Sequence, residues 1–236
     1  TTFHMTFLPT TPFTLDNIKY VWNAVPFGQY YLNTIILVVG TFCIQFVTST
    51  LAAYSLAFYR FKGQGLVFLI IFMQIIIPND VLIIPNFMTL SELGLYDTKL
   101  GVMLPFLGSA MAIFLLRQHF KTVPKALGEA AMIDGCNPLQ IFFKIVFPIL
   151  KPTMISTAIL ETMWVWNDYL LPTLVLDIKK YRTIPMAIQY FRGSYGRVEM
   201  GPMMACIMIT VLPIIVMYLV CQKYIIDGVI AGAVKG

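Results

Sequence analysis

Long runs of apolar residues, separated by short polar segments, dominate the chain. Each run approaches the ~20 residues that an α-helix needs to cross the hydrocarbon core of a bilayer. None shows the strict apolar and polar alternation of a membrane β-barrel, so a spanning backbone must satisfy its hydrogen bonds within helices. The pattern predicts an all-α, polytopic transmembrane bundle with five visible spans. These runs are Asn33 to Phe58, Leu66 to Phe87, Leu100 to Leu116, Thr153 to Leu176 and Met200 to Cys221.

Composition supports a membrane protein. Of the 236 residues, 58% are hydrophobic and only 11% are charged, and the mean hydropathy is +0.80. A soluble domain carries about 25% charged residues, and a disordered chain is less hydrophobic than this one. Both classes are therefore excluded. The net charge of +5 fits basic loops between spans better than nucleic-acid binding.

Sequence motifs for cofactors are missing. The four cysteines form no CxxC pair, and His4 and His119 are far apart, so no metal site is expected. No GxxxxGK[ST] phosphate loop occurs, and the chain is expected to bind neither ATP nor any other cofactor itself.

Basic residues suggest the orientation of the spans. Segments that contain Arg60, Arg117 and Lys223 fall on the same side, which we assign to the cytoplasm. Thr14 is expected to cap a short helix from Leu15 to Trp22 on the opposite side. The predicted organisation is an extracytoplasmic segment (1–30), a transmembrane domain (31–222) and a cytoplasmic tail (223–236). The transmembrane domain includes a cytoplasmic loop (117–152) and an outer segment (177–199).

The loop of residues 117–152 is too long for an ordinary structureless connection. Pro124 suits the first position of a helix, and Gly135 is expected to end it. Asn137 and Pro138 then predict the start of a second short helix, which runs toward Pro148. We therefore expect two short helices that project from the bilayer.

Small side chains characterise the first of these helices. Ala126, Ala130 and Ala131 are predicted to form a face that allows close approach to a partner, bracketed by Glu129 and Asp134. The alternative is an amphipathic helix on the membrane surface. Such helices usually combine basic residues with bulky apolar ones, so alanines and acids favour a protein groove.

The segment resembles the EAA loop in permease subunits of binding-protein-dependent ABC importers, which have the MetI-like fold. The residues that carry the likeness are Glu129-Ala130-Ala131, Ile133-Asp134-Gly135, Phe143, Ile145, Pro148 and Pro152. Four other stretches are similar to carbohydrate permeases, and the last of them resembles the end of the maltose-type second permease. They are residues 13–17, 54–63, 166–172 and 228–236.

This resemblance implies a subunit that couples to ATP hydrolysis by partners and catalyses no reaction itself. Its partners would be a homologous permease, two ATPase subunits that bind ATP and Mg, and an extracytoplasmic binding protein, in a prokaryotic inner membrane. Glu129 would pair with a basic residue of the ATPase, next to Ala130 and Ala131, and Asp134 would cap or pair nearby. Gly135 would permit a sharp turn. Gly232 and Lys235 would contact the ATPase from the tail.

Polar residues in the fourth run suggest a translocation path for a sugar. Ionisable groups within a membrane are costly and usually face the protein interior or water. Glu161, Trp164, Asn167 and Asp168 either line such a path or form a structural hydrogen-bond cluster. Two rival functions are an ion-coupled secondary transporter that uses Glu161, and a membrane-embedded enzyme. The rivals lack an internal repeat and a catalytic dyad, respectively.

The family resemblance also implies six spans, so a sixth is expected before Thr1. The sequence leaves the substrate open among oligosaccharides, polyol phosphates and uronic-acid chains.

Overall fold

The computed structural model describes residues 14–177, 179–191 and 200–233, and within them it contains helices and no strands. Three helices are long and apolar enough to cross a membrane, at Phe27–Phe58, Pro138–Asn167 and Met200–Lys223. Two bent helix pairs also qualify, which gives up to five spans if each pair is one span. The predicted all-α bundle is confirmed.

Helix α2 (Phe27–Phe58) is a long helix against which several later helices pack. Half of its buried residues are polar, whereas its outward face is largely apolar. This inverted arrangement is typical of membrane helices, which hold small and polar groups between helices and expose apolar groups to lipid. The inward polar residues are Asn33, Thr34, Thr41, Gln45, Ser49 and Thr50, and outward ones include Leu32, Ile35, Val39, Val47 and Leu51.

The second apolar run is broken. Helices α3 (Gln64–Ile76) and α4 (Asn79–Glu92) meet at an angle of 102°. Pro78 has no N–H to continue α3, and it forces Ile77 into an extended conformation with ψ of 117°. The expected span from Leu66 to Phe87 is therefore either a broken span or a re-entrant loop.

The third run is bent less sharply. Helix α5 (Lys99–Met103) and a 3-10 turn, η1 (Leu104–Phe106), precede helix α6 (Ala110–Phe120), which turns away by 44°. Helix α6 packs against α2, α3 and the later helix α9 (Phe147–Asn167).

The fourth helix is shifted relative to the prediction. It begins with α8 (Pro138–Ile141), passes through a π-helical turn, η2 (Phe142–Val146), and continues as α9 (Phe147–Asn167). Helix α10 (Leu170–Val175) is separate, because Pro172 can neither donate to nor fit against the carbonyl of Asp168 in a continuous helix.

Two short helices, α1 (Asp16–Ala24) and α11 (Ile184–Tyr190), lie at the outer end of the bundle beside the start of the long helix α12 (Met200–Ala233). Helix α1 packs on α12, and α11 packs on α2 and α12. The expected cap by Thr14 is wrong: Leu15 is the N-cap residue, and no side chain caps α1. A 3-10 turn, η3 (Lys179–Tyr181), precedes α11. The side chain of Asn33 donates to the carbonyls of Lys180 (2.7 Å) and Arg182 (2.9 Å), which fixes this segment to α2.

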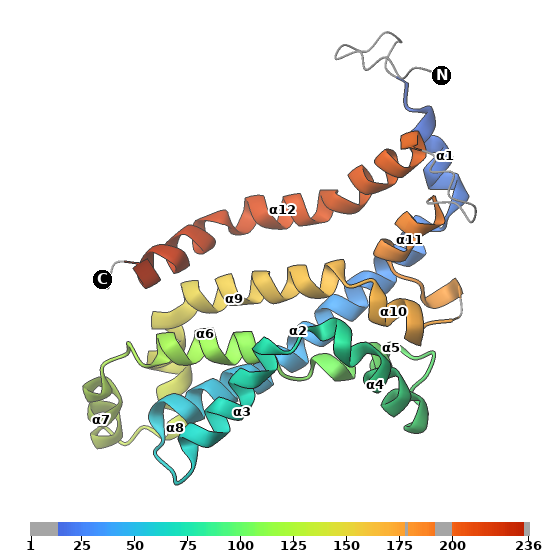
Figure 1. Cartoon of the computed structure of the whole chain (residues 1–236). Coiled ribbons are helices and arrows are strands. Elements are labelled where there is room, and N and C mark those ends of the chain that lie inside the picture. The colour runs from blue at the N-terminus through green and yellow to red at the C-terminus, as the bar shows by residue number, and fades with distance from the viewer. Residues whose placement is uncertain (1–13, 178, 192–199, 234–236) are drawn as a thin grey trace.

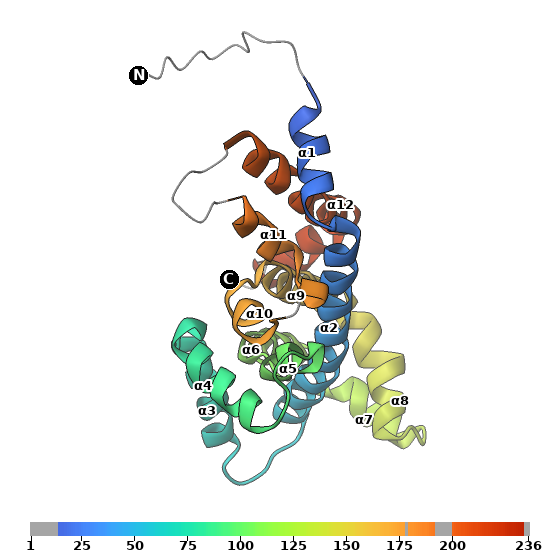
Figure 2. The same cartoon turned by 90° about the vertical axis from the view of Figure 1, so that its right-hand side faces the viewer.

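Helix α7 (Lys125–Ile133) and the turn between α2 and α3 lie at one end of the bundle, as does the C-terminal end of α12 (Figure 1). Helices α1 and α11 lie at the opposite end. Figure 2 shows α3 and α4 on one side of the bundle and α2 on the other, with α6 between them. This arrangement agrees with the predicted sidedness of the loops.

Candidate functional site

Helix α7 projects from the bundle, and the exposure of its residues shows which of them are free for contact. Ala126, Glu129 and Ala130 are exposed, whereas Ala131 is only 6% exposed and packs into the chain's own core. The prediction that Ala131 shares the partner-facing surface is therefore wrong. Adjacent residues of an α-helix point about 100° apart, so Ala130 and Ala131 face different surroundings.

The sequence assigned no contact role to the bulky apolar side chains on α7, although Ile133 belongs to the motif named above. Ile133 is 87% exposed and Met132 is 63% exposed, although both lie outside the membrane spans. Exposed apolar groups of this kind mark protein contacts when they gather in a patch. Their position between the alanines and Asp134 was the available signal. The exposed surface of α7, formed by Ala126, Leu127, Glu129, Ala130, Met132 and Ile133, is called the coupling surface below.

The turn after α7 has a defined hydrogen-bond pattern. Gly135 has φ of +82°, the left-handed conformation that was expected there. Its N–H donates to the carbonyl of Met132 (3.0 Å), and the N–H of Cys136 donates to that of Ala131 (2.9 Å). This pair of bonds is the Schellman motif. Asp134 is the exposed C-cap residue, and its backbone N–H donates to the carbonyl of Ala130 (3.0 Å).

The start of the next helix is also fixed by local bonds. Asn137 accepts a hydrogen bond from the N–H of Gln140, and Gln140 accepts one from the N–H of Asn137, both at 2.9 Å. This capping box confirms the predicted start. The expected end near Pro148 is wrong, because the helix continues into α9. The wider π turn directly before Pro148 provides room for a ring that would otherwise meet the preceding turn.

An aromatic cluster joins this segment to the spans. The ring of Tyr54 on α2 contacts Phe142 edge-on, with centroids 5.4 Å apart, and Phe120 in the same manner at 5.9 Å. Phe120 is fully buried. The coupling surface is therefore presented by a segment that packs firmly onto α2 and α6.

Arg117 holds the end of α6 next to this cluster. Its guanidinium lies 3.9 Å from the ring centroid of Phe68 on α3, and its Nε donates to the carbonyl of Leu56 on α2 (3.3 Å). Gln64 donates to the same carbonyl at 2.7 Å. One turn further, burial lowers the pKa of the Lys121 ammonium, and the charge of Arg117 lowers it further. These contacts place the start of the coupling loop against α2 and α3.

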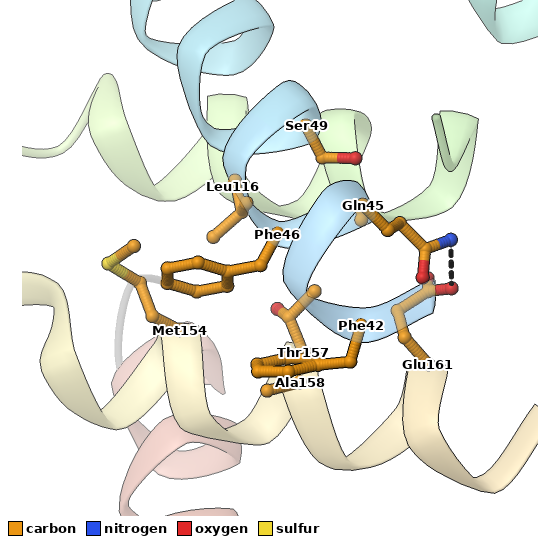
Figure 3. Close-up of a pocket in the computed structure, with 10 residues that line it drawn as sticks. Phe42, Gln45, Phe46, Ser49, Leu116, Met154, Thr157, Ala158 and Glu161 are labelled. Carbon is orange, nitrogen blue, oxygen red and sulfur yellow. Dashed lines mark hydrogen bonds between the residues drawn. The ribbon is translucent and has the colours of Figure 1, made fainter. Parts of the chain in front are cut away.

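Glu161 lies within the bundle and is bonded to neighbouring helices. Its Oε1 accepts from the hydroxyl of Ser109 (2.7 Å), and its Oε2 accepts from the side-chain amide of Gln45 (3.0 Å). Figure 3 shows the Gln45 contact beside a small cavity of about 20 Å³. The cavity is lined mainly by apolar groups, including Phe42, Phe46 and Met154.

The other residues predicted for the path do not line the cavity beside Glu161. Trp164 is 60% exposed, and exposed Asn167 donates to the carbonyl of Met163 (2.8 Å). Asp168 lines a separate cavity with Trp166, and neither Oδ2 of Asp168 nor the indole N–H has a hydrogen-bond partner in the described structure. Glu161 and Asp168 therefore line two different cavities, and neither cavity includes Trp164 or Asn167.

The predicted tail begins inside α12, which continues to Ala233. Gly232 belongs to that helix rather than to a flexible end, and Lys235 lies outside the described residues.

Comparison with known proteins identifies the family. Residues 45–229 match the model of the binding-protein-dependent transport system inner membrane component. The chain belongs to this family of permeases. The chain is therefore a transport subunit and not an enzyme.

Curated relatives cover nearly the whole permease. It is 35% identical to the probable starch degradation products transport system permease protein AmyC of Thermoanaerobacterium thermosulfurigenes, over 94% of this chain and 81% of that protein. It is 32% identical to the arabinooligosaccharides transport system permease protein AraQ of Bacillus subtilis, over 94% of this chain and 79% of that protein. It is also 32% identical to the sn-glycerol-3-phosphate transport system permease protein UgpE of Shigella flexneri, over 96% of this chain and 83% of that protein.

A solved structure confirms the fold. The permease superposes on a chain of a bacterial ABC transporter involved in the import of the acidic polysaccharide alginate, with a TM-score of 0.82 and 25% identity. The match covers 94% of this chain and 83% of that chain. The protein is thus a multi-pass membrane component of an ABC import system.

Proposed function

We propose that this permease forms half of the translocation pathway of an ATP-driven importer for a sugar or oligosaccharide. It would assemble with a homologous permease, two ATPase subunits that bind ATP and Mg, and an extracytoplasmic binding protein in a prokaryotic inner membrane. The named relatives transport starch degradation products, arabinooligosaccharides and sn-glycerol-3-phosphate. Two of these three names specify saccharides, and the solved relative takes part in the import of the acidic polysaccharide alginate, which supports a saccharide over a phosphate ester.

The coupling surface is the observation that carries this proposal. Ile133 and Met132 place apolar area outside the membrane, with the carboxylate of Glu129 beside it. An apolar centre with a charge nearby suits a groove of another protein. The role of this surface is to dock into the ATPase, while closure of the ATPase pair drives alternating access. In this proposal Asp134 and Gly135 shape the end of α7. Gly232 of α12, and Lys235 beyond the described residues, would contact the ATPase.

Exposed polar and aromatic groups remain candidates for the sugar path. Trp164 and Asn167 present an indole face and an amide near the outer end of α9. Aromatic faces and amides are suited to sugar rings and hydroxyls. Asp168 lines the cavity beside Trp166. Its role would be to shape this region rather than to contact the sugar.

Reconstitution tests the function directly. The permease is co-expressed with its partner permease and an ATPase subunit, purified and placed in proteoliposomes with the binding protein inside or outside. Uptake of a labelled oligosaccharide that requires ATP and the binding protein supports the proposal. Uptake driven by an ion gradient without ATP would contradict it and favour a secondary transporter. Competition with unlabelled arabinooligosaccharide, maltooligosaccharide and glycerol phosphate would then define the substrate class.

A further inference from the structure

Helix α9 connects two distant parts of the permease. It is continuous with α8 and η2 from Pro138 to Asn167, and its first residues follow the turn after α7 directly. Glu161 lies about four turns further along α9 than Phe147. The coupling segment is defined here as α7, the turn after it and α8 (125–141). Its displacement would move Glu161, because a helix transmits displacement along its axis.

The bend in the third span requires help from its neighbours. Residues 107–109 separate η1 from α6, and they interrupt the backbone hydrogen bonds of a membrane helix. A free N–H or C=O group in a bilayer is costly. Helix α2 supplies both partners: the hydroxyl of Thr48 donates to the carbonyl of Leu107, and the N–H of Ser109 donates to the hydroxyl oxygen of Ser49 (3.3 Å).

Ser109 joins this bend to Glu161. It is the N-cap residue of α6, and its hydroxyl oxygen accepts from the N–H of Ala112 (3.0 Å). The same hydroxyl donates to Oε1 of Glu161 at 2.7 Å. A carboxylate near the start of α6 also interacts favourably with the positive end of the helix dipole. Gln45 on α2 holds the second carboxylate oxygen (Figure 3).

We propose that Glu161 is a positioning residue for transport: through Ser109 it fixes the start of α6 to α9, so that movement of the coupling segment reaches the bend in the third span. This inference rests on the proposed function, since it needs a coupled ATPase. It differs from a role in lining the sugar path, because the carboxylate is engaged by Ser109 and Gln45. It also gives an intramembrane acid a purpose other than ion coupling.

The test compares four variants in the reconstituted importer. Glu161→Ala removes the carboxylate, and Ser109→Ala removes the donor while it leaves the acid in place. Glu161→Gln keeps an acceptor for Ser109, and its amide can donate to Oε1 of Gln45, which has no partner in the described structure. Thr157→Val is the matched control: Thr157 lines the same cavity one turn before Glu161, but its hydroxyl donates within α9, to the carbonyl of Thr153 (3.0 Å).

Uptake, ATP hydrolysis and retention of the ATPase are measured for each complex. Glu161→Ala and Ser109→Ala should lower uptake per ATP hydrolysed by about tenfold, as expected when a hydrogen bond to a charged group is lost. Retention of the ATPase should not change, because α7 is untouched. Combining both substitutions should add little to either one. Glu161→Gln and Thr157→Val should stay close to the wild type, and the rescue by glutamine separates positioning from a need for charge.

Three results would overturn the inference. Normal coupling in both alanine variants removes any role for the contact. A glutamine variant as poor as Glu161→Ala, together with a normal Ser109→Ala variant, shows that charge matters and the contact does not. A loss in Thr157→Val equal to that in Glu161→Ala points to general damage around the cavity. If the Glu161→Ala permease fails to assemble, uptake per ATP hydrolysed by the Ser109→Ala complex decides whether the inference holds. Absence of ATP-driven uptake in the wild type would instead overturn the proposed function.

Discussion

Phe142 lies edge-on against Tyr54, with ring centroids 5.4 Å apart and ring planes at 81°. The two residues belong to different parts of the permease, since Phe142 follows the coupling helix and Tyr54 is near the end of α2. Edge-to-face pairs add about 0.5–1.5 kcal/mol to the energy of burial. This contact therefore makes the coupling segment part of the bundle, so that a force applied at α7 is passed to the spans.

Phe142 and its neighbour Phe143 allow a matched test of this joint. Phe142 is 9% exposed, and Phe143 is 62% exposed. Truncation of a buried phenylalanine typically costs about 3–5 kcal/mol. Phe142→Ala should lower the apparent unfolding temperature of the purified complex, whereas Phe143→Ala should change it much less. Equal shifts for the two variants, measured by fluorescence-detected unfolding in detergent, would show that Tyr54 does not anchor the segment.

Ala130 and Ala131 should respond differently to the same substitution. Leucine at position 131 would be forced into a filled core, which typically costs about 1–3 kcal/mol. Leucine at the exposed position 130 should leave the permease stable but disturb the docking of α7. Thermal unfolding of the permease and capture of the ATPase by the tagged permease separate the two effects. The assignment of faces is wrong if Ala130→Leu destabilises the permease more than Ala131→Leu.

Gly135 should be sensitive to any side chain. Its φ of +82° lies in the left-handed region, where a residue with a Cβ costs about 1–2 kcal/mol. An added Cβ would meet no atom within 4 Å, so backbone strain is the whole effect. Gly135→Ala should therefore destabilise the turn and weaken coupling.

Gly128 supplies the control for this effect. It lies inside α7, and a Cβ there would also meet nothing within 4 Å. Alanine is favoured over glycine in a helix by about 0.5–1 kcal/mol, so Gly128→Ala should be neutral or stabilising. Protease sensitivity of the loop and the unfolding temperature are suitable measurements. A similar loss in both variants would indicate that the coupling surface, rather than the turn, is affected.

Local sequence signals predicted the local structure of the coupling loop well. Gly135 ends α7 and Asn137 starts the next helix, because both effects depend on backbone bonds within a few residues. The apolar runs likewise predicted the bundle, because length and hydrophobicity suffice to define a span.

Features that depend on packing between distant residues were harder to predict. The burial of Ala131 depends on a core built from α2, α6 and α9, and the bonds of Glu161 depend on Gln45 and Ser109, which lie far away in the sequence. The π turn before Pro148 similarly reflects the need to join the coupling loop to α9 without a break. Helix periodicity alone assigns positions to faces, but it does not say which face meets the chain's own core.

The last prediction concerns Glu129, which should couple ATP hydrolysis to transport. Its side chain is exposed in the permease alone, so substitutions there should change the permease's own stability by less than about 0.5 kcal/mol. In the complex, the carboxylate is expected to meet a basic group of the ATPase. Loss of one partner costs about 3–5 kcal/mol for a buried pair but under about 1 kcal/mol for an exposed one.

The size of the effect therefore reports how deeply Glu129 docks. Glu129→Ala should weaken retention of the ATPase or separate hydrolysis from uptake, and Glu129→Lys should be worse because it adds repulsion between like charges. Glu129→Gln keeps the shape and isolates the contribution of charge. Membrane insertion should be normal for all three, since no span is altered. If all three retain full uptake and full binding-protein-stimulated hydrolysis in reconstituted complexes, Glu129 is only a solvated charge, and the exposed apolar side chains of Met132 and Ile133 must provide the docking energy.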